Sequence, residues 1–323
     1  MNLNKILIRL LLASLLSGIL IFYGCNRQTG EADDGKVIAL VVKTLNNPFF
    51  IDMERGARET ADRLGVKLSV HAAEREIDVE QQMQIVENLI QRNVAAICIA
   101  PSGSRELVPA IVKANKAGIP VLAVDSRVDS AALKEAGGTV VTFIGSDNFQ
   151  GGLIAGKYIC DLFNSNAKVA VLEGLPGHET GDQRLAGFHA AVDTVKGIDI
   201  VASQTANWER DKGFVVFQNI LQAHRDIDAL FACNDMMALG AIEAISAAGR
   251  KGDIVVIGFD ATDDGRESIR RNEMKASIAQ HPAEMGRQAV INAIKIINGE
   301  KVPEYIPVKI ELITKEKLDS ASQ

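Results

Sequence analysis

The stretch Val37–Gly65, VIALVVKTLNNPFFIDMERGARETADRLG, joins an apolar run to a helical pattern. Val37–Val42 is apolar throughout, as expected for a strand buried on both faces of a parallel sheet. Four apolar residues then fall at i, i+4, i+8 and i+11, which places them on one face of a helix: Met53, Ala57, Ala61 and Leu64. Gly65 stands where a left-handed cap commonly ends a helix. The stretch therefore predicts a βα unit of an α/β protein.

The connection Lys43–Phe50, KTLNNPFF, is richer than a strand-to-helix turn requires. It holds a lysine, two asparagines, a proline and two adjacent phenylalanines. Ligands of doubly wound sheets bind outside the carboxyl ends of the strands. Residues that directly follow strands are therefore the candidates for a functional site.

The βα alternation runs along most of the chain and restarts midway. The 323 residues exceed the size at which one hydrophobic core stops growing, so two domains are expected. Predicted strands lie at 37–42, 66–70, 95–99 and 121–124, and again at 140–144, 169–172, 198–203, 230–232 and 254–258. Predicted helices lie at 48–64, 78–92 and 104–117, and again at 150–163, 181–195, 210–223 and 237–248. We predict two similar doubly wound parallel-sheet lobes.

The N-terminus is typical of an export signal. Lys5 and Arg9 precede the largely apolar run LLLASLLSGILIFYGC, which is too short for a membrane-spanning helix. The pattern resembles a lipoprotein signal, with residues 1–24 removed and Cys25 lipidated, although Phe22 and Tyr23 are bulkier than is usual there; ordinary signal cleavage nearby is the alternative. Residues 25–35 are polar and are expected to form a tether.

Composition and missing motifs exclude several classes of function. A formal net charge of −6 argues against a nucleic-acid partner, since phosphate binding needs a basic face. No P-loop follows a strand, because Gly174–Arg184, GLPGHETGDQR, has the wrong glycine spacing and no lysine. GxGxxG, GxSxG and HExxH are also absent. Single cysteines in apolar runs predict buried thiols: Cys98, Cys160 and Cys233. We therefore expect no cofactor, no metal and no enzymatic activity.

Polar and aromatic residues gather at the predicted strand ends. The first lobe supplies Lys43, Asn47, Phe49, Phe50, Asp125 and Ser126, and the second supplies Arg184, Trp208, Asn234, Asp260 and Gln280. Amides, carboxylates and guanidinium groups pair with neighbouring hydroxyls, and aromatic rings cover the C–H faces of a sugar ring. The set suits a small, uncharged, hydroxyl-rich ligand.

Simpler roles remain open for individual members of this set. Phe49 or Phe50 could be core, and Asp125 or Asp260 could cap a helix. Arg184 could be a solvated helix charge, and Asn234 could belong to a turn. Trp208 is harder to explain this way, because it is a lone tryptophan in a polar connection.

Six segments carry a resemblance to a known family: ALVVKTLNNPFF, IPVLAVD, VASQTANWERDKG, FACNDMMALGA, VVIGFD and SIAQHPAEMG. They resemble the ribose- and allose-binding proteins of bacterial sugar ABC importers, which have the type I periplasmic binding protein fold. The resemblance spans about residues 36–315. It implies sugar contacts for the strand-end residues, with Asn47, Phe49 and Phe50 on one wall and Trp208 on the other.

Two positions bear on which sugar is implied. Allose binders carry lysine at the position of Lys43, where ribose binders carry a small hydroxyl residue. Ser126 replaces an arginine of ribose binders, and Arg127 follows one place later. The resemblance therefore favours a hexopyranose such as allose over ribose.

The resemblance also implies an organisation and partners. Three hinge strands near 144–147, 279–281 and 308–310 would join an N-terminal lobe (36–146 plus 281–309) to a C-terminal lobe (147–280 plus 310–323). The protein would capture a monosaccharide and deliver it to an ABC permease with its ATPase subunit. We expect a monomer, exported to the periplasm or the outer face of the cell membrane, that contacts the membrane through its lipid anchor only.

Three other classes of function were weighed against transport. A sugar sensor for a chemoreceptor or sensor kinase fits the same residues and stays open. A repressor of the same fold would need an N-terminal helix-turn-helix, where this chain has a signal and a short tether. An exported glycoside hydrolase would have to turn over a sugar substrate.

Overall fold

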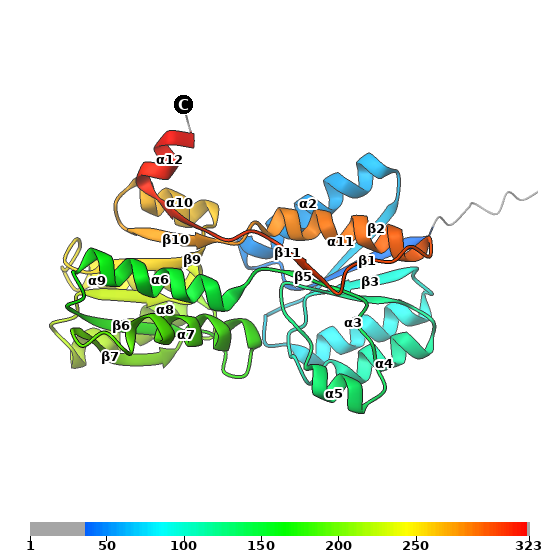
Figure 1. The fold of residues 1–323 in the computed structure, drawn as a ribbon, viewed down its shortest axis with the longest axis horizontal. Coiled ribbons are helices and arrows are strands. Elements are labelled where there is room, and N and C mark those ends of the chain that lie inside the picture. Colours follow the sequence, from blue (N-terminus) through cyan, green and yellow to red (C-terminus); the bar gives the residue numbers. More distant parts are fainter. Residues whose placement is uncertain (1–35, 322–323) are drawn as a thin grey trace, which may run out of the picture. The chain divides into compact units, whose positions relative to one another are not determined.

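The computed structural model describes residues 36–321 as two α/β sheets with covering helices (Figure 1). The predictions for the signal peptide, Cys25 and the tether lie outside the described residues. Within 36–321 no helix is both long and apolar enough to cross a membrane. The described chain is therefore built from two repeats of the predicted βα architecture.

The first sheet is entirely parallel. Its strands are β1 (Val37–Thr44), β2 (Lys67–Ala73), β3 (Ala96–Ile99), β4 (Val121–Val124), β5 (Phe143–Gly145) and β11 (Tyr305–Pro307). They lie in the order β11-β5-β4-β3-β1-β2. The order reverses between β1 and β3, and the carboxyl end of a doubly wound sheet at such a switch point is where ligands bind.

Strand β1 is buried on both faces, as its apolar sequence predicts. Ile38, Leu40 and Val42 pack with α2 (Pro48–Leu64) and α11 (Pro282–Ile297). Ala39 and Val41 face the opposite way, toward α3 (Val79–Gln91) and α4 (Val108–Lys116), and the short α5 (Ser130–Glu135) lies beyond α4. The period of two along the strand thus divides its side chains between two helix layers.

The second sheet repeats this order, but the strand in the place of β11 is antiparallel. Its strands are β6 (Ala167–Glu173), β7 (Ile198–Thr205), β8 (Ala229–Ala232), β9 (Val255–Asp260), β10 (Ala276–Ala279) and β12 (Glu311–Thr314), ordered β12-β10-β9-β8-β6-β7. β12 runs antiparallel to β10, so the expectation of a parallel sheet is wrong at this edge. The reason is topological: β12 returns from the other sheet, and edge strands of mixed sheets are commonly antiparallel.

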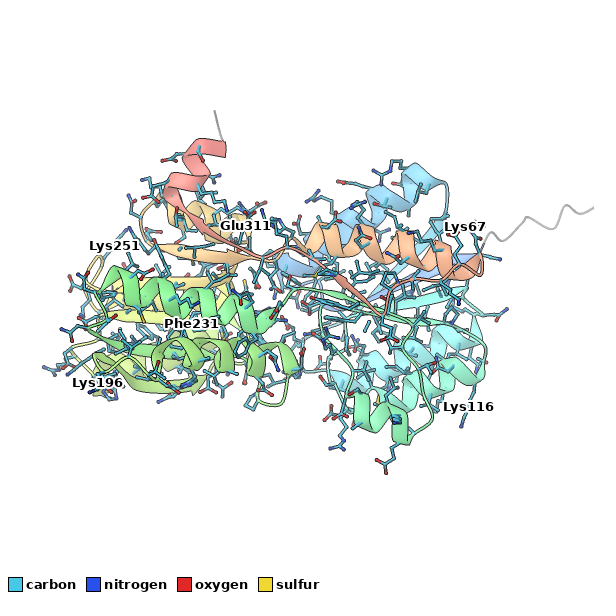
Figure 2. The ribbon with its side chains drawn as sticks, in the orientation of Figure 1. Lys67, Lys116, Lys196, Phe231, Lys251 and Glu311 are labelled. Atoms are coloured by element: carbon cyan, nitrogen blue, oxygen red, sulfur yellow. The ribbon has the colours of Figure 1, made fainter. Side chains whose placement is uncertain are left out.

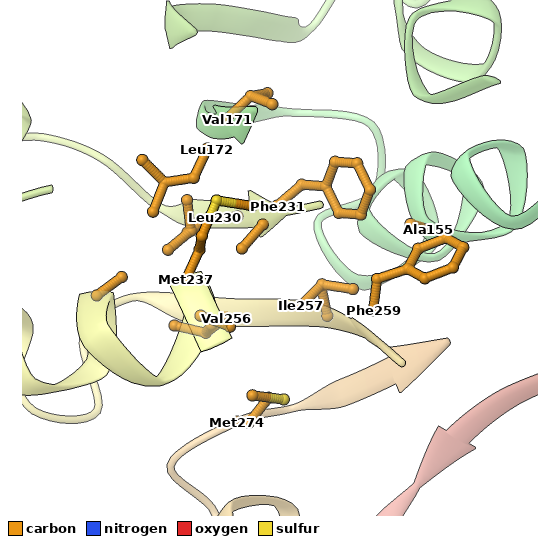
Figure 3. Close-up of a cluster of buried hydrophobic side chains, with 14 of the residues drawn as sticks. Ala155, Val171, Leu172, Leu230, Phe231, Met237, Val256, Ile257, Phe259 and Met274 are labelled. Carbon is orange, nitrogen blue, oxygen red and sulfur yellow. The ribbon is translucent and has the colours of Figure 1, made fainter. Parts of the chain in front are cut away.

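The helices of the second sheet are α6 (Asn148–Leu162), α7 (Glu179–Val192), α8 (Arg210–Ala223), α9 (Asp235–Ala247), α10 (Asp263–Arg270) and α12 (Lys315–Ala321). Figure 3 shows part of the core beneath them, where Phe231, Phe259 and Ala155 meet. Figure 2 shows charged residues such as Lys116 and Lys196 at the periphery, with Phe231 inside. The three described cysteines are free and buried, as predicted.

Several element boundaries differ from the predicted ones. The strand predicted at 140–144 begins at Phe143, because Val140 packs on the core beneath α4 instead. The helix predicted from 104 begins at Val108, since Pro109 favours the first turn of a helix. No helix or sheet strand was predicted for the segments that form α11, β10, β11 and β12. Only the hinge strands near 279–281 and 308–310 were predicted there. The chain passes between the sheets at 146–147, 280–281 and 308–310, in connections between regular elements.

Close helix packing makes one stability prediction. Gly286 of α11 lies so near α2 that an added Cβ would be 2.0 Å from the Met53 carbonyl oxygen. We expect Gly286→Ala to destabilise the protein by about 1–3 kcal/mol, because overpacked cores must shift backbone. Urea unfolding measures the change. Lys295→Ala, an exposed site on the same helix, is the control and should change stability by less than about 0.5 kcal/mol; equal effects would contradict the packing argument.

Candidate functional site

Ten of the eleven predicted site residues line one pocket, which we call the central pocket. It is formed by Lys43, Asn47, Phe49, Phe50, Glu76, Asp125, Thr180, Arg184, Trp208, Asn234, Asp260 and Gln280. These residues come from the strand ends of both sheets and from the start of α7. Ser126 is the exception: it is buried behind the pocket and its hydroxyl donates to the Asp125 carboxylate at 2.8 Å.

The first wall follows from the sequence NNPFF. Asn47 is the N-cap of α2, and its Oδ1 accepts a hydrogen bond from the Phe49 amide at 3.0 Å, with Pro48 at the first helical position. Phe49 and Phe50 lie edge to face with ring centroids 5.2 Å apart. The helix start therefore fixes an amide and two rings at the pocket surface.

Lys43 and Asp125 form an ion pair on the same wall. Lys43 is the penultimate residue of β1, Asp125 follows β4, and Lys43 Nζ lies 3.4 Å from an Asp125 carboxylate oxygen. Both are about 96% buried. Asp125 does not cap a helix, since Asp129 is the N-cap of α5. A left-handed φ of 64° turns Asp125 out of the strand, and non-glycine residues adopt this conformation uncommonly.

Arg184 is the centre of the second wall. It is buried, and it donates through Nε to Asn148 Oδ1 at 2.8 Å and through Nη1 to the Cys233 carbonyl at 2.7 Å. Nη1 also lies 3.6 Å from Asp260 Oδ1, and the guanidinium covers the Phe259 ring at 3.9 Å. Arg184 is therefore a buried, paired charge and not a solvated one.

Asp260 and Gln280 lie beside this arginine. Gln280 Nε2 donates to Asp260 Oδ1 at 2.6 Å, while Gln280 Oε1 is buried without a hydrogen-bond partner among the described residues. Burial raises the pKa of Asp260 well above its usual value, and Arg184 opposes that rise. An unused buried acceptor is costly unless a ligand supplies a donor, so this corner is suited to a hydroxyl group.

Trp208 and Asn234 complete the second wall. Asn234 caps α9 through Oδ1 and donates from Nδ2 to the Trp208 carbonyl at 3.1 Å. Trp208 has a left-handed φ of 70° and is buried, with its indole packed against Gly174. The geometry holds the indole as one side of the pocket.

Arg127 points away from the central pocket. Its guanidinium lies 3.8 Å above the Phe143 ring and 4.9 Å above that of Tyr305. It also comes within 3.9 Å of Glu179 of α7, so it joins the two walls at their edge. Burial raises the pKa of Glu179, an effect that Arg127 opposes.

The central pocket is nearly filled by its own side chains. Its free volume is about 20 Å³, room for roughly one water. An adjoining cavity of about 520 Å³ shares Asn47, Glu76 and Trp208 with it. A larger cavity, about 560 Å³, lies against α9 and β9 and contains none of the predicted residues. Among the described residues, no group of three or more His, Cys, Asp or Glu could hold a metal ion.

Sequence reasoning missed two lining residues, Glu76 and Thr180. Glu76 follows β2, whose strand was expected to end at residue 70 although it runs to Ala73. Thr180 lies in the glycine-containing segment 174–184, which was considered only as a phosphate loop. Both residues follow strands, so the rule that residues after each strand are site candidates would have found them.

Comparison with known proteins agrees with this architecture. The ribose import binding protein of Haemophilus influenzae is 38% identical over 94% of this chain and 99% of its own length. The D-allose-binding periplasmic protein of Escherichia coli is 35% identical over 85% of this chain and 91% of its own length. A solved ABC transporter solute-binding protein of Actinobacillus succinogenes, with bound D-allose, has a TM-score of 0.85 at 38% identity, covering 88% of this chain and 99% of that one.

The family described as periplasmic binding protein domain matches residues 38–301. This range contains both sheets except β11 and β12, and all twelve residues of the central pocket. The chain belongs to the periplasmic binding protein domain family.

Proposed function

We propose that this protein captures a monosaccharide, allose-like or ribose-like, in the central pocket and delivers it to an ABC permease. The observation that carries the proposal is the convergence of ten of the predicted side chains, from the strand ends and following helices of both sheets, on one pocket. Amide, carboxylate, ammonium and guanidinium groups stand there beside three aromatic rings. This is the chemistry that a ring with several hydroxyls requires.

Sheet membership supports a division into lobes at 36–146 plus 281–309 and 147–280 plus 310–323. The two walls lie close together in the described conformation, with about 20 Å³ of free space between them, so a sugar would need them to move apart before it could bind. A sugar would enter an open form and favour closure by contacting both walls. Ser146 and Gln280, on two of the crossings, are joined by a 3.4 Å hydrogen bond, so Gln280 would link the ligand to the hinge.

The remaining parts of the proposal concern the cell. We propose an exported protein, anchored through a lipid on Cys25, which works as a monomer with a permease and a separate ATPase subunit. The chain would perform no chemistry of its own. Labelling with a radioactive fatty acid, with Cys25→Ala as the control, tests the anchor; equal labelling of the two forms would contradict it.

Fluorescence titration tests sugar binding. Trp208 is the single tryptophan of the chain, so its emission reports on the second wall. Allose, ribose, galactose, glucose, fructose, psicose and myo-inositol would be titrated, with thermal melting in parallel. A sugar at 100 times its Kd should add about 2.7 kcal/mol of stability. We expect one sugar to saturate the emission change and raise the Tm; no response to any of the seven would contradict capture of a simple sugar.

A further inference from the structure

Glu76 stands at the boundary between the central pocket and the adjoining cavity, and it lines both. It lies in the turn between β2 and α3, at the carboxyl end of an edge strand. The residue is half-buried, unlike Glu74 two positions earlier, which is exposed and lines the adjoining cavity only. Glu76 therefore occupies the place where one edge of a captured sugar would meet the adjoining cavity.

The bonding of Glu76 leaves one carboxylate oxygen unused. Asn47 Nδ2 donates to Glu76 Oε1 at 2.8 Å, while Asn47 Oδ1 is occupied by the Phe49 amide. No other hydrogen bond or ion pair reaches this carboxylate from the described residues. An ionised carboxylate only accepts hydrogen bonds, so the second oxygen can take a hydroxyl donor.

A purely structural role explains these features less well. Asn47 is already fixed as the N-cap of α2, so it does not need a carboxylate partner to hold its position. Burial raises the pKa of Glu76, whereas the charge of Lys43 and the hydrogen bond that Glu76 accepts from Asn47 lower it. A neutral glutamine could accept from Asn47 without this desolvation cost. The carboxylate is thus better explained by a donor that the described chain does not supply.

We propose that Glu76 is a specificity-determining residue, which accepts a hydrogen bond from one hydroxyl of the captured sugar at the side that faces the adjoining cavity. The inference rests on the proposed function and names the substrate class more closely: sugars that carry a hydroxyl at that edge of the ring. A site that hydrogen-bonds a hydroxyl binds the analogue lacking it more weakly, because the acceptor then loses its partner.

The test compares the cognate sugar with its monodeoxy analogues, one for each hydroxyl. Wild-type protein, Glu76→Gln, Glu76→Ala and the control Glu74→Gln would each be titrated with the whole set. We expect wild-type protein to bind one analogue at least 10-fold more weakly than the parent sugar. In Glu76→Ala that ratio should fall below about 3-fold, while the ratios for the other analogues stay unchanged.

Glu76→Gln separates charge from position. Its amide oxygen can keep the bond from Asn47, but it loses the charge-assisted bond to the hydroxyl, so the ratio should fall between those of wild type and Glu76→Ala. Glu74→Gln should leave every ratio as in wild type. A uniform loss of affinity for all analogues in Glu76→Ala would show that Glu76 only supports Asn47, and would overturn the inference.

The two proposals fail in different ways. If wild-type protein binds no sugar of the panel, the proposed function fails and the inference with it. If it binds a sugar but Glu76→Ala keeps the full set of ratios, sugar capture stands and the inference alone is overturned. Thermal melting without ligand confirms that each variant is folded.

Discussion

Replacing Arg184 with alanine is expected to weaken sugar binding by about 10- to 150-fold, or 1.5–3 kcal/mol. The same change should destabilise the ligand-free protein by about 3–5 kcal/mol, because it leaves a buried charge without its partner. Arg184 donates to Asn148 and to the Cys233 carbonyl and pairs with Asp260, and the pair is about 95% buried. No other residue of the pocket combines so many buried bonds with the wall itself.

Isothermal titration and urea unfolding measure the two effects separately. Arg225→Ala, an exposed arginine of the same lobe, is the matched control and should change neither. The double variant Arg184→Ala/Asp260→Asn should regain much of the lost stability without regaining affinity, since it removes the unpaired carboxylate but not the need for a donor. Wild-type affinity in Arg184→Ala would mean that the sugar binds elsewhere.

The pH dependence of Arg184→Ala follows from Asp260. Burial already holds the pKa of Asp260 above its usual value, and loss of the arginine removes the main opposing charge. A carboxyl whose pKa is raised on folding binds more protons when folded, so its contribution to stability is present at low pH and is lost as pH rises through the folded pKa. We expect the variant to lose stability more steeply than wild type as the pH rises above the ordinary aspartate pKa of about 3.9.

Much of this architecture could be predicted because the signals were local. The unbroken apolar run Val37–Val42 reflects burial on both faces of a sheet, and the helical period after it reflects burial of one helix face; a single sequence records both patterns directly. The antiparallel β12 could not be read the same way, since its direction depends on the path of the chain between two sheets. The path of the chain from one sheet to the other leaves no periodic pattern in the sequence.

The functional site, like the fold, was predictable in part and unpredictable in part. Asn47 and Asn234 each have two roles, because each caps a helix and lines the pocket with the same side chain. Glu76 was missed because β2 is an edge strand, half-exposed, so its apolar pattern breaks at His71 before the strand ends. Ser126 does not line the pocket although Asp125 does, and sequence order alone does not tell which of two adjacent side chains faces it.

Displacing Trp208 without removing it is the second large expected effect. Gly174 directly follows β6, before the turn, and a Cβ there would lie 2.0 Å from Cζ2 and 2.2 Å from Cη2 of Trp208. Real Cβ atoms do not approach so closely, so the Trp208 ring must move in the Gly174→Ala variant. We expect a loss of sugar affinity of about 10- to 100-fold, or roughly 1.5–3 kcal/mol, because the ligand loses a large, rigid stacking face.

Gly181 provides a graded comparison. A Cβ at Gly181 would lie 3.0 Å from Trp208 Cζ2, so Gly181→Ala should displace the ring less and weaken binding less than Gly174→Ala. Both substitutions avoid positions of positive φ, so their effects come from the contact with the indole and not from backbone strain. Titration calorimetry measures all variants in the same way, including those without tryptophan.

A double-mutant cycle with Trp208→Phe decides whether the indole transmits the effect. The smaller phenylalanine ring lacks the atoms that the new methyl group would meet, so Gly174→Ala should cost much less affinity in that background. Equal costs in the two backgrounds would mean that Gly174 acts through the turn that follows β6 and not through the indole. A reduced cost would show that sugar affinity depends on the position of the Trp208 ring, for which the absence of a Cβ at Gly174 leaves room. It would also place the second wall of the pocket at Trp208.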